Sequence, residues 1–391
     1  MADRDAVIID AVRTPVGRAR GDLSSVHAVD LAAHAIAGLV GRTGIDPALV
    51  DDVLLGCVDQ VGEQGLNVAR TAALAAGLPE SVPAVTVDRQ CGSSQQAVHF
   101  AAQGILSGAY DIAIAGGVES MTRVPMFANT PDFTAAYGPR FRERYDLGPD
   151  DLISQGESGE IVADRWDLGR DELDAFAAMS HARAEAARAG GRFDDEILPI
   201  DVRHDDGAIA TVTRDQGIRP DTSPAALAEL APVFREDGRL TAGNSSQLSD
   251  GAAALLIMDG ASARRLGLTP IARVHSMALA AVDPVTMLTA PIPATRRVLE
   301  RAGLDIGDID LFECNEAFAS VPLAWQRDLG VDPDRVNVNG GAIALGHPLG
   351  ASGARIMTTL LHEMRRRGVR WGLQTMCEGG GMADATILEA I

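Results

Sequence analysis

The strongest constraint on the fold is that the second part of the chain repeats the first. Three pairs of segments match in order: 44–55 with 303–312, 85–88 with 336–339, and 111–117 with the strand that enters Cys377-Glu378-Gly379-Gly380. Internal repeats of this kind indicate one topology used twice. We therefore expect two related halves, formed by residues 1–118 together with 248–268, and by residues 269–391.

Within each half, β-rich runs alternate with helical stretches. The runs at 6–12, 53–56, 85–87 and 112–115 are predicted strands, and apolar residues at helical spacing predict a helix over 30–40. Such alternation is typical of an α/β fold, and we expect a mostly parallel sheet.

Residues 119–247 have no counterpart in the second half and form a predicted insertion. Five of the chain's aromatic residues lie between positions 127 and 145, and 156–190 shows strong helix patterning. The aromatic cluster fits either a cover over a substrate or a satellite core beneath a long loop.

Composition narrows the partners and the compartment. The formal charge of −20 argues against nucleic acid and anionic membranes as partners. No apolar run is long enough for a transmembrane helix. Four cysteines in 391 residues make no disulfide framework, so the expected location is a reducing cytoplasm.

Cys91 is the first candidate for chemistry. It follows a predicted strand and precedes a predicted helix over 94–106. A helix N-terminus favours an anion, so we expect a lowered thiol pKa and a reactive thiolate. The alternative is a buried structural cysteine.

Three further side chains lie in segments that suit a site. His347 sits among glycines in 340–353, where an imidazole can act as a base or oxyanion donor. Cys377 ends a predicted strand before three glycines whose N–H groups are accessible. Asn315 follows another strand, where it could hold a water or cap a helix. Because the His347 and Cys91 loops follow equivalent strands, a pseudo-twofold axis would bring them together.

Taken together, these motifs resemble those of the thiolase family. The resemblance rests on 241–246, on Asn315-Glu316-Ala317-Phe318-Ala319, on 340–348 and on Cys377-Glu378-Gly379-Gly380-Gly381, and it extends from residue 6 to 391. It implies two duplicated βαβαβαββ-type halves in an α/β/α/β/α layering, with 119–247 as a loop domain over the substrate site.

The resemblance also implies a reaction and its residues. Thiolases cleave 3-ketoacyl-CoA with CoA, or run the reverse Claisen condensation. Cys91 matches the nucleophile, His347 the residue that activates it, and Cys377 the acid/base that serves the acetyl-CoA enolate. Asn315 matches the asparagine that holds a water beside His347 in one oxyanion hole. The N–H groups of Cys91 and Gly379 match the other.

Binding contacts and assembly follow from the same resemblance. Arg219, Ser246, Met287 and Phe318 match positions that contact CoA or the substrate. The family implies no metal and no tightly bound cofactor, since CoA enters as a substrate. It also implies a homodimer or homotetramer.

Several positions depart from the family pattern. Ser94, Gln247 and Ala383 stand where glycine is usual, and Glu378 stands where an apolar residue is common. Ser154-Gln155 replaces the His-Met of short-chain enzymes, which argues against acetoacetyl-CoA as substrate.

The segment 87–96 is more similar to degradative thiolases, including some linked to steroid-ring breakdown. Two other functions fit the same fold. A ketoacyl synthase would lack the Cys377-x-Gly-Gly-Gly ending, and a silent acyl-CoA-binding or carrier protein would not need both thiols.

Overall fold

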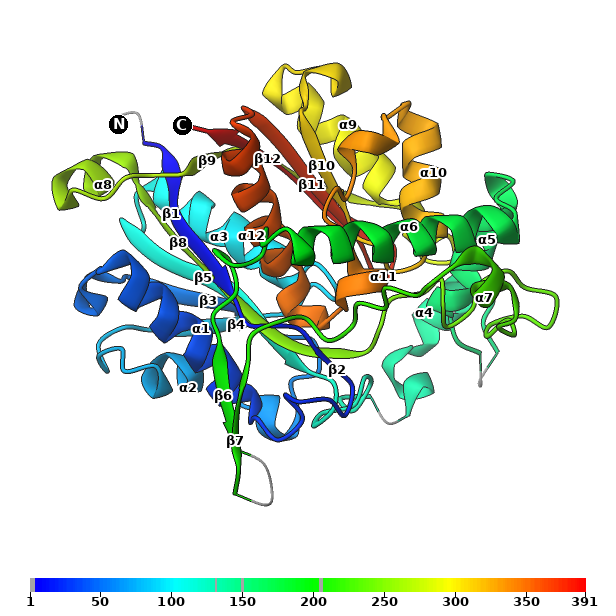
Figure 1. Ribbon diagram of the computed structural model, residues 1–391, viewed down its shortest axis with the longest axis horizontal. Helices are drawn as coiled ribbons and strands as arrows, with labels where there is room; N and C mark the ends of the chain where they lie inside the picture. The colour runs from blue at the N-terminus through cyan, green and yellow to red at the C-terminus, as the bar shows by residue number, and fades with distance from the viewer. Residues whose placement is uncertain (1–3, 131, 149–150, 204–206) are drawn as a thin grey trace.

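The computed structural model describes residues 4–130, 132–148, 151–203 and 207–391 (Figure 1). Its main sheet has the order β10-β11-β12-β9-β1-β8-β5-β3-β4, with β2 (Gly17–Arg18) beside β8. The first half supplies β1 (Ala6–Arg13), β3 (Asp52–Gly56), β4 (Ala84–Val87), β5 (Ile112–Ser120) and β8 (Ser249–Asp259). The second half supplies β9 (Ala272–Ala281), β10 (Leu311–Cys314), β11 (Trp371–Glu378) and β12 (Met382–Ala390).

This order contains the repeat that the sequence predicts. In the first half β1, β8, β5, β3 and β4 are successive neighbours, and in the second half β9, β12, β11 and β10 follow the same path. Val336 completes the second path, because it bridges Phe312 in parallel as β4 pairs with β3. The strand order supports the predicted division at residues 1–118 plus 248–268 and 269–391, whose boundaries stay a prediction.

The expectation of a mostly parallel sheet is wrong. Parallel pairing is found for β3 with β4, β3 with β5, and β10 with β11. The pairs β1–β8, β1–β9, β5–β8, β9–β12 and β11–β12 are antiparallel. The β11–β12 connection is a tight hairpin whose Gly380 and Gly381 take φ of 80° and 81°, and such reversals join neighbouring strands in opposite directions.

Helices cover both faces of each half in layers. The helices of the halves are α1 (Ala28–Thr43), α2 (Val68–Ala75), α3 (Ser93–Ser107), α8 (Gly260–Leu266), α9 (Pro291–Ala302), α10 (Ser320–Leu329), α11 (Ala342–Leu345) and α12 (Leu349–Arg367). Helices α1 and α2 pack on the outer face of the first half and α9 on that of the second. Helices α3 and α12 pack on each other, α3 on strands of the first half and α12 on strands of both halves. The expected α/β/α/β/α layering is therefore confirmed.

The insertion contributes α4 (Pro139–Arg144), α5 (Gln155–Arg165), α6 (Arg170–Ala189), the hairpin of β6 (Ile200–Arg203) and β7 (Ile209–Val212), and α7 (Pro224–Ala228). In Figure 1 α4, α5 and α7 gather at one end of the molecule. Helix α5 packs against α10, and α6 packs against α11, so the insertion reaches the second half. Within the described part of the chain, no helix combines the length and apolar character needed to cross a bilayer.

Close backbone contacts seat the central helices on the first half. A Cβ added at Gly56 would lie 2.3 Å from the Ser94 nitrogen and 2.6 Å from the Gly350 carbonyl oxygen. One added at Gly117 would lie 2.1 Å from that same oxygen. Both β3 and β5 therefore need glycine where α3 and α12 begin.

We predict that Gly56→Ala lowers the stability of the fold by about 1–3 kcal/mol, since backbone atoms cannot move aside as a side chain could. The melting temperature measured by circular dichroism checks this. Gly41→Ala is the matched control, because a Cβ at that exposed position of α1 meets nothing within 4 Å. It should raise stability by about 0.5–1 kcal/mol. An unchanged melting temperature for Gly56→Ala would contradict the close-packing argument.

Candidate active site

Cys91 lies on a sharp turn between β4 and α3. Gln90, just before it, adopts a left-handed conformation with φ of 50°, and Gly92 caps the helix that begins at Ser93. The Ser93 hydroxyl closes the turn, since it donates to the Gln90 carbonyl at 2.6 Å and accepts from the Arg89 N–H at 2.9 Å. This strained backbone places the buried Cys91 thiol beside the start of α3.

His347 lies at the equivalent place before α12, and its tautomer is defined by Ser352. The Ser352 hydroxyl donates to the Pro348 carbonyl at 2.8 Å and lies 2.6 Å from His347 Nδ1. Since the single proton of that hydroxyl is already donated to Pro348, the hydroxyl oxygen accepts a hydrogen bond from His347, and His347 Nδ1 carries the hydrogen. The Nε2 atom of His347 then carries no hydrogen, and its lone pair can accept a proton.

Asn315 follows β10 and faces His347. Its Nδ2 lies 3.4 Å from His347 Nε2, and its buried Oδ1 has no hydrogen-bond partner among the described residues. The helix-cap alternative is wrong, because α10 begins at Ser320 with Ala319 as its N-cap. An unpaired buried carbonyl oxygen beside an imidazole is suited to holding a water.

The Cys91 turn packs against the end of β11, although β4 and β11 are not neighbours in the sheet, because Cys91 contacts Met376. Cys377 lies one residue before the end of β11 and directly after Met376, which packs against Cys91, and the charge of Cys91 raises the pKa of Cys377. The backbone N–H of Gly379 points at the Cys91 sulfur. Asn315 donates its backbone N–H to Thr375, two residues before Cys377, at 3.1 Å. Segments far apart in the sequence therefore converge where β10 and β11 end and α3 and α12 begin.

The thiol of Cys91 is less acidic than expected from its helix N-terminus. Burial, followed by the charge of Glu378, raises its pKa to about 12. The side chain of Gln155 and the N–H groups of Cys91 and Gly379 act in the opposite direction but are outweighed. The expected lowered pKa is thus wrong, because desolvation disfavours the thiolate more than the helix end favours it.

The neighbouring groups are also held neutral. Burial, and then the charge of Arg355, lowers the pKa of His347 to about 3. Burial raises the pKa of Cys377 well above its usual value. The resting site therefore contains two thiols and a neutral imidazole rather than a preformed ion pair.

The residues expected to contact CoA occupy different surroundings. Ser246 donates its N–H to Ala317 at 2.9 Å, which places it beside Phe318, whose ring meets Phe234 edge-on at 5.5 Å. Arg219 is exposed and donates its N–H to His181 at 3.1 Å. Met287 is buried in the same apolar cluster as Phe318 and Cys377. Their contacts with CoA stay a prediction.

Departures from the family pattern have structural roles. Ser94 Oγ accepts from the Ala354 N–H at 2.9 Å and so joins α3 to α12. The Gln247 amide donates to Ile343 at 2.7 Å and to Gly217 at 3.0 Å, and the Gln247 carbonyl accepts the His347 N–H. These polar contacts hold the loops on either side of His347.

In the insertion, Tyr137, Phe141 and Tyr145 stack along α4 with ring centroids 4.7 and 4.8 Å apart. All three side chains are only partly buried, so they do not form a fully buried satellite core. The proposed role in covering a substrate stays a prediction.

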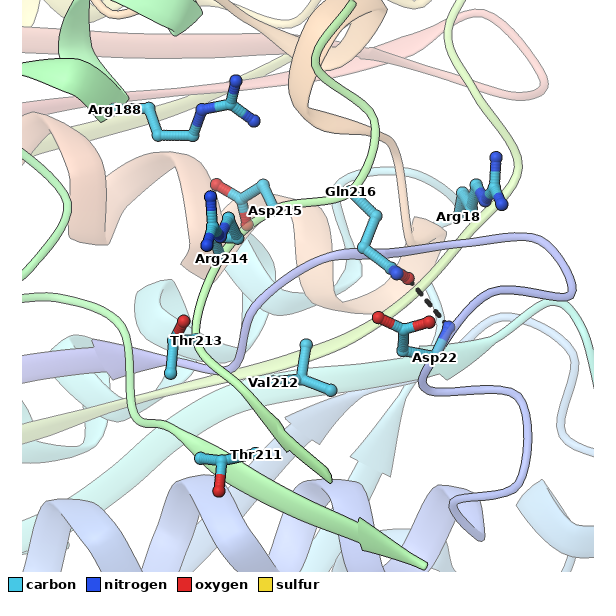
Figure 2. Close-up of a pocket in the computed structure, with 9 residues that line it drawn as sticks. All are labelled: Arg18, Asp22, Arg188, Thr211, Val212, Thr213, Arg214, Asp215 and Gln216. Atoms are coloured by element: carbon cyan, nitrogen blue, oxygen red, sulfur yellow. Dashed lines mark hydrogen bonds between the residues drawn. The ribbon is translucent and has the colours of Figure 1, made fainter. Parts of the chain in front are cut away.

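A separate surface hollow of about 320 Å³ lies near the β7 end of the insertion (Figure 2). It is lined by residues 211–216 with Arg18, Asp22 and Arg188, and Gln216 accepts the Asp22 N–H at 2.9 Å. The four candidate catalytic side chains are not among its lining residues. Within the described residues, no group of His, Cys, Asp and Glu is placed to hold a metal ion.

Comparison with known proteins identifies the family. Residues 6–261 match the family model for the thiolase N-terminal domain, and residues 268–390 match that for the thiolase C-terminal domain. The chain belongs to the thiolase family.

Individual relatives cover the whole chain. A steroid 3-ketoacyl-CoA thiolase of Mycobacterium tuberculosis is 49% identical over 99% of this chain and 94% of its own length. A 3-ketoacyl-CoA thiolase of Bacillus subtilis is 44% identical over 99% of both. The crystal structure of the Bacillus anthracis acetyl-CoA acetyltransferase superposes with a TM-score of 0.92 at 39% identity, with 100% of both chains covered.

We predict that iodoacetamide alkylates Cys91 in the free protein at a rate that still rises between pH 7 and pH 10. A thiol whose pKa is raised to about 12 gains thiolate over that whole interval. Peptide mass spectrometry after timed alkylation measures the rate for each cysteine, with an unfolded sample as the reference for an ordinary thiol. A plateau below pH 9 would contradict the raised pKa.

Proposed function

We propose that this thiolase cleaves 3-ketoacyl-CoA with CoA, giving acetyl-CoA and a shortened acyl-CoA through an acyl-Cys91 intermediate. The same site would run the reverse Claisen condensation. The observation that carries the proposal is the packing of Cys91 against Met376, the residue before Cys377, at a site where Asn315 also faces His347. It supports a site in which one sulfur holds an acyl group while the other moves a proton.

In the first step Cys91 Sγ attacks the 3-keto carbon, and its proton passes to His347 Nε2. The neutral His347, with Nδ1–H donated to Ser352, has its lone pair ready for that transfer. Because both partners start neutral, the thiolate forms only as the substrate is attacked.

In the second step the bond between C2 and C3 breaks, and its electron pair goes to the acetyl-CoA enolate. The Cys377 thiol donates its proton to C2 of that enolate. A raised thiol pKa suits this role, since Cys377 remains protonated until a strongly basic carbanion forms beside it.

In the final step the CoA thiol gives its proton to the Cys377 thiolate, and its sulfur attacks acyl-Cys91 and takes the acyl group. The leaving Cys91 thiolate takes back the proton held on His347 Nε2, so both thiols and the neutral imidazole are restored. Oxyanions form on the thioester and acyl oxygens along the way. One oxyanion would be held by protonated His347 with a water on Asn315 Oδ1, and the other by the N–H groups of Cys91 and Gly379.

The wider setting follows from the family resemblance. We propose that Arg219, Ser246, Met287 and Phe318 contact CoA or the acyl chain. We also propose that no cofactor is tightly bound and that the protein works as a homodimer or homotetramer in the cytoplasm. Retention of Cys377 supports a thiolase over a ketoacyl synthase.

We predict turnover with at least one ester from a panel of straight-chain and ring-derived 3-ketoacyl-CoA substrates, measured as CoA-dependent acetyl-CoA release. The ring-derived esters are included because one relative is a steroid 3-ketoacyl-CoA thiolase. Cys91→Ser and His347→Ala should lower kcat by about 100-fold or more, since each removes a reacting group.

Cys57→Ala serves as the control, because Cys57 is a buried thiol that the mechanism does not use. It should keep most of the activity. Absence of turnover by the folded wild type with every ester would favour the silent acyl-CoA-binding alternative.

We predict that Ser352→Ala lowers kcat by about tenfold or more with a small change in KM, because His347 loses the partner that fixes its tautomer. Steady-state kinetics with the best ester measures both constants. Thr358→Val is the matched control. The Thr358 hydroxyl also donates to a carbonyl one turn earlier on α12, at a distance of 2.8 Å, but it does not contact His347. Equal losses in the two variants would contradict a role through His347.

A further inference from the structure

Behind the Cys91 turn lie two carboxyl side chains that the mechanism does not use. Glu378 and Asp384 are both fully buried, with 0% exposure. They lie on β11 and β12, where Asp384 pairs with Met376, so Glu378 and Asp384 share one face of the hairpin as diagonal neighbours. Met376 on that face packs against Cys91, which places the pair next to the nucleophile.

The two carboxyl groups are held together against the backbone of the Cys91 turn. A Cβ added at Gly92 would lie 2.1 Å from Glu378 Oε1 and 2.9 Å from Asp384 Oδ2. Glycine is therefore needed at position 92 because the carboxyl groups occupy the space that a side chain would take.

Within the described residues, no side chain outside the pair donates a hydrogen bond to it. All four carboxyl oxygens are buried, and the one N–H group among the described residues that faces them is the backbone N–H of Asp384. Two adjacent buried carboxylates without side-chain donors would repel each other in a medium of low polarity. Protonation of both groups removes the repulsion and lets one carboxyl donate a hydrogen bond to the other.

The charges that face this pair come from three elements. Arg89, on the Cys91 turn, favours the ionised carboxyls, and Asp88 beside it opposes ionisation of Glu378. Helix α3 presents His99, whose pKa burial and Arg89 lower to about 3, so it is neutral. On the hairpin itself, Cys377 is the remaining titratable neighbour.

The net effect of these surroundings is to keep protons on the pair. Burial raises the pKa of Glu378 to about 8, and burial with the charge of Glu378 raises that of Asp384 well above its usual value. The charge of ionised Glu378 in turn raises the pKa of both Cys91 and Cys377. Protonation of the pair and ionisation of the thiols are thus linked through space.

We propose that Glu378 and Asp384 are positioning residues that act as a hydrogen-bonded pair of carboxylic acids and control how easily the Cys91 thiolate forms. At neutral pH the protonated pair leaves no negative charge behind Cys91 and lets the thiolate develop. As the pH rises the pair loses a proton, and its negative charge opposes ionisation of the Cys91 thiol. The effect of the carboxyl pair on catalysis rests on the function proposed above, whereas its effect on ionisation of the Cys91 thiol does not.

The double variant Glu378→Gln/Asp384→Asn tests this, because it keeps the shapes and hydrogen bonds but cannot acquire a charge. Alkylation of Cys91 at pH 9 should be about tenfold faster than in the wild type, which corresponds to a thiol pKa lower by about one unit. The kcat of the double variant should also fall off less at high pH. Glu363→Gln is the control, since Glu363 is a buried carboxyl on α12 that pairs with Arg366 and Arg367 instead.

Infrared difference spectra between pH 7 and pH 10 give a direct second measurement. The wild type should lose the carbonyl band of a buried protonated carboxylic acid on raising the pH, and either single variant, Glu378→Gln or Asp384→Asn, should change that band. Alkylation in the folded double variant at the wild-type rate, or a wild-type spectrum without the acid band at pH 7, would overturn the proposal. Faster alkylation in an enzyme that turns over no ester would uphold the pair and refute only the proposed function.

Discussion

The rest of the structure depends on the close packing of α3 against α12 in the central layer. Gly353 of α12 has no room for a side chain, since a Cβ there would lie 2.4 Å from the Gln95 nitrogen of α3. Gly350 of α12 meets Gly56 and Gly117 of the first half in the same way. Small residues at these points let two helices from different halves approach each other and align their N-termini. Cys91 and His347 lie at those N-termini, so packing that has no chemistry of its own decides where the reactive atoms are.

The site that results works with neutral groups. Burial keeps Cys91 and Cys377 as thiols and His347 as a neutral imidazole. A charge in such surroundings is costly unless a donor meets it at once. The donors are backbone N–H groups and a side-chain amide at fixed positions, so charge is stabilised only where the reaction creates it. This arrangement favours the transition state over the resting enzyme.

Much of this was predictable from the sequence, and the reasons for the misses are physical. The internal repeat correctly predicted that Val85-Thr86-Val87 is equivalent to the segment at Val336. It also predicted that the Cys91 and His347 loops lie at equivalent strand ends. The antiparallel strands were missed because a buried strand such as β8 is apolar whatever its direction. The predicted lowering of the Cys91 pKa was wrong because desolvation depends on which groups cover the sulfur. Two of those groups, Gln155 and Glu378, come from segments distant in the sequence. Ser352 went unnoticed because its role depends on Pro348 taking its only proton.

Few backbone hydrogen bonds join the two halves of the sheet edge to edge. Strands β1 and β9 pair only at Val7 with Arg273 and Ile8 with Ala272. The halves are therefore held mainly by side-chain packing across the central layer, while the reaction needs atoms from both. A slight slip between the halves separates the nucleophile from its base before either half loses a strand or a helix. On heating, catalytic competence is the most fragile property of this architecture, and the secondary structure outlasts it.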